Sequence, residues 1–146
     1  MKKILLLTLS LLLVGCSIGQ IEDTNGDEDY TIETISNEKI ISGGSSASLG
    51  SIQTTVNGNT KYKVDKFSGI KTIETFRLNN ESFNLSIMCE VEKGNFMVAL
   101  TTDSEIVKVF KNNDTDNYVI DNHKGTYYLK IVGESAKFNI SYSNDN

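Results

Sequence analysis

The chain has 146 residues, and its 19 acidic side chains outnumber its 14 Lys and Arg side chains, which gives a net charge of −5. Most of the acidic excess lies before residue 51, and no dense cluster of Lys and Arg follows it. Nucleic-acid binding is therefore not expected, because it requires clustered cations that neutralise phosphates. One histidine and two cysteines also fall short of the four nitrogen or sulfur ligands of a structural zinc site, so we predict no metal or other cofactor.

Residues 1–15 are predicted to be a secretory signal. Lys2 and Lys3 precede an apolar run over residues 4–14, which Thr8 and Ser10 alone interrupt. A short basic segment followed by such a run is typical of signal peptides. The run is too short to cross a bilayer as a helix, which takes about 20 apolar residues.

The signal ends in Leu13-Val14-Gly15-Cys16, and these residues resemble the lipobox of bacterial lipoproteins. The resemblance implies a diacylglyceryl group on the Cys16 thiol, cleavage before Cys16 and often acylation of the new amine. Two or three acyl chains anchor a protein stably, whereas a single chain binds reversibly. We therefore expect a lipid anchor that holds the protein on the extracytoplasmic side of a cell membrane. The alternative is a plain secretory signal with an incidental cysteine.

Residues 16–50 are predicted to be a flexible linker. An acidic block over residues 22–29 and a Gly/Ser-rich block over residues 42–48 lack the apolar surface needed to offset the entropy of ordering. The acidic block resembles a calcium loop only in part, since an EF-hand needs Gly where Glu28 stands and Glu where Thr34 stands. The apolar residues between positions 30 and 41 fit neither a helical nor a strand period, so their structure is left open.

Residues 51–146 are predicted to form one all-β domain. Apolar side chains alternate with polar ones along residues 83–91, which is typical of a half-buried strand. Further short strands are predicted over residues 52–56, 61–66, 70–78, 96–100, 106–110, 118–120, 126–132 and 136–142, and the alternation is clear again over residues 136–142. Short strands joined by turns such as Asn57-Gly58, without a long helical period, predict an antiparallel two-sheet sandwich of the jelly-roll type.

The stretch over residues 124–132, followed by residues 137–142, resembles the closing hairpin of small jelly-roll modules such as bacterial pre-peptidase C-terminal domains. The chain is also similar to small Gram-positive lipoproteins of unknown function. The first resemblance covers residues 72–143 and implies a jelly-roll fold with a non-catalytic accessory role. The acidic calcium ligands that some of these modules carry have no obvious match in this chain.

We predict no catalytic residues. His123 lies in a predicted turn, and Cys89 lies on the apolar face of a strand, where a thiol is usually an inert hydrophobe. Glu90 and Glu92 share the outward face of that strand and are interpreted as solvated acids.

Two candidate binding sites remain. Asp114 and Asp116, in an Asn-rich loop, offer oxygen ligands for a weak calcium site. Tyr118 and Tyr128 offer rings for ligand contact, and alternation places Tyr128 away from the predicted core.

The sequence thus predicts a non-enzymatic, lipid-anchored module that binds a surface protein or a glycan. A small cell-wall hydrolase that uses loop carboxylates is one alternative, and a ligand-free structural surface protein is another. The hydrolase would need two carboxyl groups about 5–9.5 Å apart in a cleft.

Overall fold

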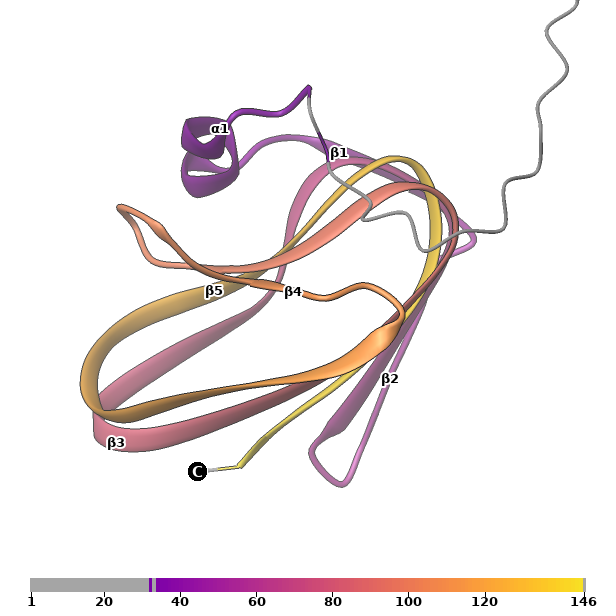
Figure 1. Cartoon of the computed structure of the whole chain (residues 1–146). Coiled ribbons are helices and arrows are strands. Elements are labelled where there is room, and N and C mark those ends of the chain that lie inside the picture. The colour runs from indigo at the N-terminus through magenta and orange to yellow at the C-terminus, as the bar shows by residue number, and fades with distance from the viewer. Residues whose placement is uncertain (1–31, 33, 146) are drawn as a thin grey trace, which may run out of the picture.

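The computed structural model describes residue 32 and residues 34–145 (Figure 1). The predicted signal, Cys16 and the acidic block lie outside these residues. No helix in the described part is long and apolar enough to cross a membrane. Its elements in chain order are α1 (Asn37–Ser42), β1 (Ser46–Leu49), β2 (Ile52–Val56), β3 (Asn59–Thr101), β4 (Ile106–Phe110) and β5 (Asp114–Asp145).

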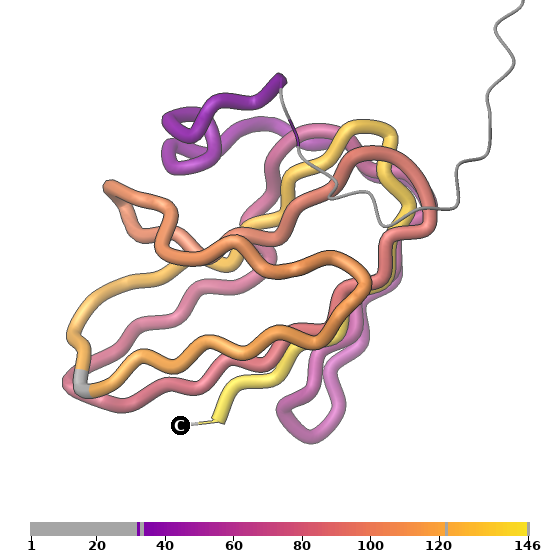
Figure 2. The backbone as a smooth tube through the Cα atoms, viewed as in Figure 1, coloured from indigo at the N-terminus to yellow at the C-terminus, as the bar shows by residue number. Residues whose placement is uncertain are grey.

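The long strands β3 and β5 run side by side and bend together, as Figure 2 shows. Residues 59–67 of β3 pair with residues 136–143 of β5, and residues 69–81 pair with residues 123–133. Beyond its next bend, β3 returns along the other side of β5, where residues 84–93 pair with residues 137–145 and residues 95–101 with residues 128–134. All these pairs are antiparallel.

These bends divide the strands between two facing sheets. The first sheet runs from β2 through residues 59–67, 136–145 and 84–93 to residues 114–120. The second sheet runs from residues 69–81 through residues 123–133 and 95–101 to β4, and β1 extends the edge at residues 66–69. The structure therefore confirms the predicted antiparallel two-sheet sandwich of the jelly-roll type.

The main core lies between the two sheets and is centred on aromatic rings. Phe138 stacks on Phe96 with 4.0 Å between ring centroids, and it meets Phe67 edge-on at 5.8 Å. Cys89 is fully buried in the same core, as its place in the alternation predicted. Burial raises the pKa of the Cys89 thiol to about 12, so the group stays an uncharged thiol.

A second apolar cluster lies on the outer face of the second sheet and is covered by the segment that contains α1. Ile32 and Ile40 contact Ile70, Ala99 and Val132 there. The helix begins at its N-cap Ser36, whose hydroxyl accepts a hydrogen bond from the Lys39 amide. At this place the strands of the second sheet carry apolar side chains on both faces, a feature that simple alternation does not reveal.

Lys130 fixes the end of α1 to the second sheet. Its buried ammonium donates hydrogen bonds to the carbonyl oxygens of Ile40, at 2.9 Å, and Ile41, at 2.6 Å. Burial lowers the pKa of Lys130, and the carboxylate of Asp103 opposes that shift. A lysine at the C-terminal end of a helix supplies donors to carbonyl oxygens that have no hydrogen-bond partner within the helix.

The structure corrects the predicted flexible linker in its last part. Residues 37–42 form α1 and residues 46–49 form β1, which pairs with residues 66–69 of β3. The end of the Gly/Ser-rich block forms an edge strand because its backbone groups make hydrogen bonds to β3. The apolar residues before it are held by partners far along the chain, among them Ala99 and Val132, which lie 59 and 92 positions after Ile40.

We expect Lys130→Met to loosen α1 while leaving the sandwich folded. The aliphatic part of the side chain is kept, but two helix carbonyls lose their donor, at a cost of about 1–3 kcal/mol in the free energy of unfolding. Hydrogen exchange measured on the amides of residues 37–42 should become faster. Lys124→Met removes an exposed lysine from the same strand and serves as the control. Unchanged exchange in the Lys130 variant would mean that this contact does not hold the helix.

Candidate binding cleft

A cleft of about 350 Å³ opens where one end of the first sheet parts from the second. Its volume lies within the range of small-molecule sites, which starts at about 300 Å³. The cleft has an apolar floor, hydroxyl-bearing walls with one carboxylate, and a polar rim. Its lining residues are Thr55, Gly58, Thr60, Glu74, Thr75, Phe76, Arg77, Leu78, Phe83, Tyr142 and Asn144.

One wall is a hairpin formed by β2 and the start of β3. Asn57 and Gly58 have φ values of 50° and 74°, as a two-residue turn of this kind requires, and the sequence predicted this turn. The turn sets Thr55 opposite Thr60, and their hydroxyls share a hydrogen bond of 3.0 Å. The wall therefore presents two hydroxyl groups to the cleft.

The opposite wall carries Glu74, which a β-bulge turns inward. Thr72 pairs with Lys130 on the outer face, whereas Glu74 pairs with Leu129, whose side chain is buried in the main core. The register therefore shifts by one residue at Ile73. A bulge of this kind re-aims the side chains that follow it, so Glu74 shares a face with the buried Phe76.

Tyr142 joins the two walls through Glu74. Its phenol donates a hydrogen bond to Glu74 Oε2 over 3.3 Å. Burial, followed by the charge of the Glu74 carboxylate, raises the pKa of Tyr142 to about 12. The phenol is therefore a hydrogen-bond donor throughout the physiological pH range.

The floor and rim of the cleft differ in polarity. Phe76 and Phe83 form the floor, with 4.6 Å between their ring centroids, and both are buried. Asn144 is exposed at the rim. Arg77 alternates with the buried Phe76 and Leu78 and so turns its side chain to the outer face of the second sheet. A ligand would meet hydrogen-bonding groups at its edges and apolar surface beneath.

The lining residues bear on the hydrolase alternative. Glu74 is the one acid among those of this cleft, and Glu90 is the one acid lining a smaller depression of about 160 Å³ on the outer face of the first sheet. Neither lining set of described residues supplies the two carboxyl groups that glycoside hydrolysis ordinarily uses.

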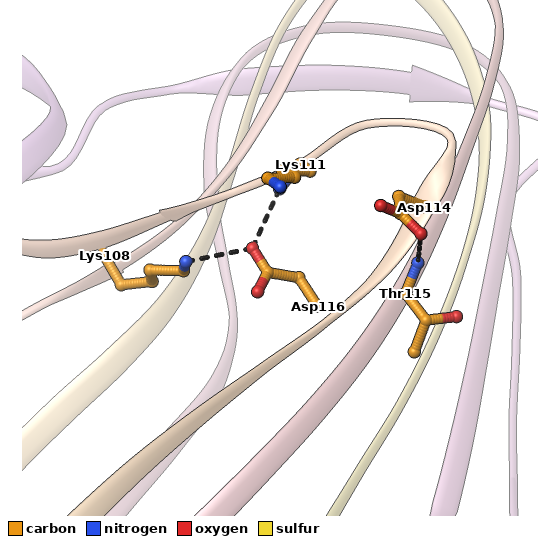
Figure 3. A network of polar contacts seen from close by, with 5 residues as sticks. All are labelled: Lys108, Lys111, Asp114, Thr115 and Asp116. Atoms are coloured by element: carbon orange, nitrogen blue, oxygen red, sulfur yellow. Dashed lines mark hydrogen bonds and ion pairs between the residues drawn. The ribbon is translucent and has the colours of Figure 1, made fainter.

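The acids predicted to bind calcium have separate partners (Figure 3). Asp116 Oδ2 lies 3.0 Å from Lys108 Nζ and accepts a hydrogen bond from the Lys111 amide. Burial raises the pKa of Asp116 and the Lys108 ammonium lowers it, and the net pKa lies below the usual value. Asp114 accepts from the amide of Thr115 at 2.7 Å. No three His, Cys, Asp or Glu side chains in the described part are placed to share a metal ion, and the calcium site stays a prediction.

Tyr118 and Tyr128, the predicted ligand contacts, do not line the cleft. Tyr118 is half-buried against the main core. Tyr128 belongs to the second sheet, where the ammonium of Lys130 lies 5.5 Å from its ring centroid. The structure therefore places the two rings in different surroundings, and their role in binding stays a prediction.

Sequence reasoning missed Glu74 and Tyr142. The signal that was available is the position of Glu74 two residues before Phe76 and four before Leu78, which puts a carboxylate on an apolar strand face. A charged residue on such a face rarely stays buried without a partner. The identity of that partner, 68 positions away, had no local signal.

Neither a family model nor a curated protein sequence matches the chain. A cupin domain from Bordetella pertussis Tohama I is 12% identical with a TM-score of 0.35, and the match covers 68% of this chain and 98% of that one. A protein of unknown function from Acidithiobacillus ferrooxidans is 13% identical with a TM-score of 0.28, covering 77% and 99%. A domain of CENP-C from Drosophila melanogaster is 19% identical with a TM-score of 0.28, covering 68% and 77%. Similarity at this level carries no conclusion about function.

Proposed function

We propose that the protein is a lipid-anchored, non-enzymatic binding module outside the cell, and that its cleft takes a glycan unit. The observation that carries the proposal is the hydrogen-bonded pair of Glu74 and Tyr142, set beside an apolar floor in a cleft of ligand size. The anchor rests on the lipobox that ends in Cys16.

A sugar suits this cleft because it carries hydroxyl groups around its ring and C–H groups on its faces. The Glu74 carboxylate accepts hydrogen bonds, and the Asn144 amide and the threonine hydroxyls can both donate and accept them. The apolar floor suits the C–H face. A surface protein is the weaker candidate for this cleft, because a stable protein interface usually buries about 800 Å² on each partner.

The residues that line the cleft support the non-enzymatic part of the proposal. Glu74 has no second acid beside it among the lining residues, and the Tyr142 phenol is held in its protonated form. These groups can bind and orient a ligand. Acid–base cleavage of a glycosidic bond would require a second carboxyl group.

Glycan binding is expected to depend on Glu74 and Asn144. The full-length protein in detergent would be screened against an array of bacterial and host surface glycans, and the affinity for each hit measured by calorimetry. Glu74→Gln should weaken binding by about tenfold or more, because charge-assisted hydrogen bonds contribute about 1.5–3 kcal/mol. Asn144→Ala should weaken it by about fivefold, because a neutral hydrogen bond contributes about 1 kcal/mol. Glu90→Gln, an exposed acid outside the cleft, is the matched control.

Two results would count against this function. Equal affinity in the wild type and both cleft variants would place binding elsewhere. Shortened glycan products in the mass spectrum, lost in Glu74→Gln, would favour the hydrolase instead.

A further inference from the structure

β2 is an edge strand with one side unpaired by the described residues. Its residues pair with residues 59–63 of β3 on one side, and no described strand pairs with the other. Figure 1 shows the β2 hairpin at the lower rim of the molecule, projecting beyond the sandwich. A row of backbone donors and acceptors is therefore available to another strand.

This edge lacks the features that usually prevent sheets from joining. Natural edge strands carry charged residues, prolines or bulges. Residues 42–60 contain no charged side chain and no proline, although 23% of the chain is charged. The register of β2 against β3 has no shift, and Ile52 and Val56 are 65% and 61% exposed. β2 is therefore a regular, neutral and partly apolar edge.

The sequence of β2, Ile-Gln-Thr-Thr-Val, is self-complementary when two copies run antiparallel about Thr54. Ile52 then faces Val56 of the other copy, and Gln53 faces Thr55. Ile52, Thr54 and Val56 share one face, because they alternate with Gln53 and Thr55, which pair with the buried Tyr62 and Thr60. Opposed β-branched side chains are favourable cross-strand neighbours.

Electrostatics does not oppose this pairing. The nearest cations, Lys61 and Lys63, lie one strand further in, opposite Thr54 and Ile52. Across the joined edge, Lys61 of one molecule would lie three strand spacings, or about 14 Å, from Lys61 of the other. Exposed charges at that distance are largely screened at physiological salt.

We propose that β2 pairs with β2 of a second copy, which joins the first sheets of two molecules into one continuous sheet with two-fold symmetry. Such an interface is isologous and therefore closes as a dimer. Since the paired edge is short, the interface falls below the size of stable complexes, and we expect a dimer that forms at micromolar or higher concentrations.

The pairing has a consequence for the cleft, and that consequence rests on the proposed function. A two-fold axis perpendicular to the sheet keeps equivalent faces on the same side. Thr55 lines the cleft, so the two clefts of the dimer would open on one side, close to the joined edge. Two sites arranged in this way could bind one repeating glycan at the same time, with a higher apparent affinity than a single site has.

Sedimentation velocity of the full-length protein in density-matched detergent tests the pairing. The wild type should shift from monomer to dimer as its concentration rises. Thr54→Lys places two like charges directly opposite each other at the two-fold axis and should remain monomeric over the same range. Asn139→Lys adds the same charge to an exposed site in the middle of the first sheet and should dimerise like the wild type.

A wild type that stays monomeric throughout, or a Thr54→Lys variant that dimerises equally well, would overturn the proposal. Binding of an extended peptide at β2 by a monomeric wild type would also overturn it, since the edge would then serve another protein. Calorimetry with a glycan ligand keeps the two proposals apart. Thr54 points away from the cleft, so a monomeric Thr54→Lys variant should still bind a single glycan unit, whereas loss of cleft binding appears only in Glu74 and Asn144 variants.

Discussion

Phe138→Ala is expected to lower the free energy of unfolding by about 3–5 kcal/mol. The Phe138 ring is fully buried at the centre of the main core, stacked on Phe96 and close to the rings of Phe67 and Tyr62. Phe96 belongs to the second sheet and Phe138 to the first, so this stacked pair joins the two layers. Removing the ring leaves a cavity that rigid β-strands on both sides cannot close.

The measurement is equilibrium unfolding in urea, followed by tyrosine fluorescence and by far-ultraviolet circular dichroism. Asn139→Ala, the exposed neighbour on the same strand, is the control and should change the free energy by less than about 0.5 kcal/mol. A loss below about 1 kcal/mol in Phe138→Ala would mean that the two sheets do not meet at this ring.

Cys16→Ala is expected to move the protein from the membrane to the aqueous phase. If Cys16 carries the diacylglyceryl group, its replacement removes the acyl chains, and each buried methylene contributes about 0.8 kcal/mol to membrane binding. Phase partition in a cloud-point detergent, combined with labelling of cells by a radioactive fatty acid, would measure the change. The wild type should partition with the detergent and carry the label, and the variant should do neither.

Cys89→Ala is the matched control for that experiment. Cys89 is buried and its thiol donates to the Asn112 side chain at 3.6 Å, so its loss should leave partition and labelling unchanged. Continued detergent partition with the label in Cys16→Ala would contradict lipidation at this residue.

The sheet architecture was predictable because it depends on local patterns. Alternation over residues 83–91 and 136–142 and the turn at Asn57-Gly58 follow directly from side-chain period and backbone geometry. The continuity of β3 and β5 was not predictable. Their bends carry one strand from the first sheet into the second, which replaces the many short separate strands expected from turn residues.

The docking of α1 escaped prediction for a different reason. Ile70, Ala99 and Val132 lie on the face that alternation assigns to solvent, and their neighbours along each strand fill the main core. Only their assembly in three dimensions creates an apolar patch large enough to hold Ile40. The partner of Lys130 likewise lies 90 positions away.

The residues of the cleft could not be predicted for the same reason. The residue types of Tyr118, Tyr128, Asp114 and Asp116 suit ligands and ions, but residue type alone does not say which side chains converge. The convergence of Glu74 with Tyr142 depends on a bulge at Ile73 and on the long pairing of β3 with β5.

The measurement that tests the binding proposal most directly is a titration of isotope-labelled protein with a glycan hit from the array, followed by nuclear magnetic resonance. The proposal predicts saturable shifts that are largest at Thr55, Glu74, Tyr142 and Asn144, which line the cleft. It also predicts small shifts around Tyr128 and Lys130 on the outer face of the second sheet. Saturable shifts centred on those two residues, or no saturable shift with any hit, would contradict the assignment of the cleft as the binding site.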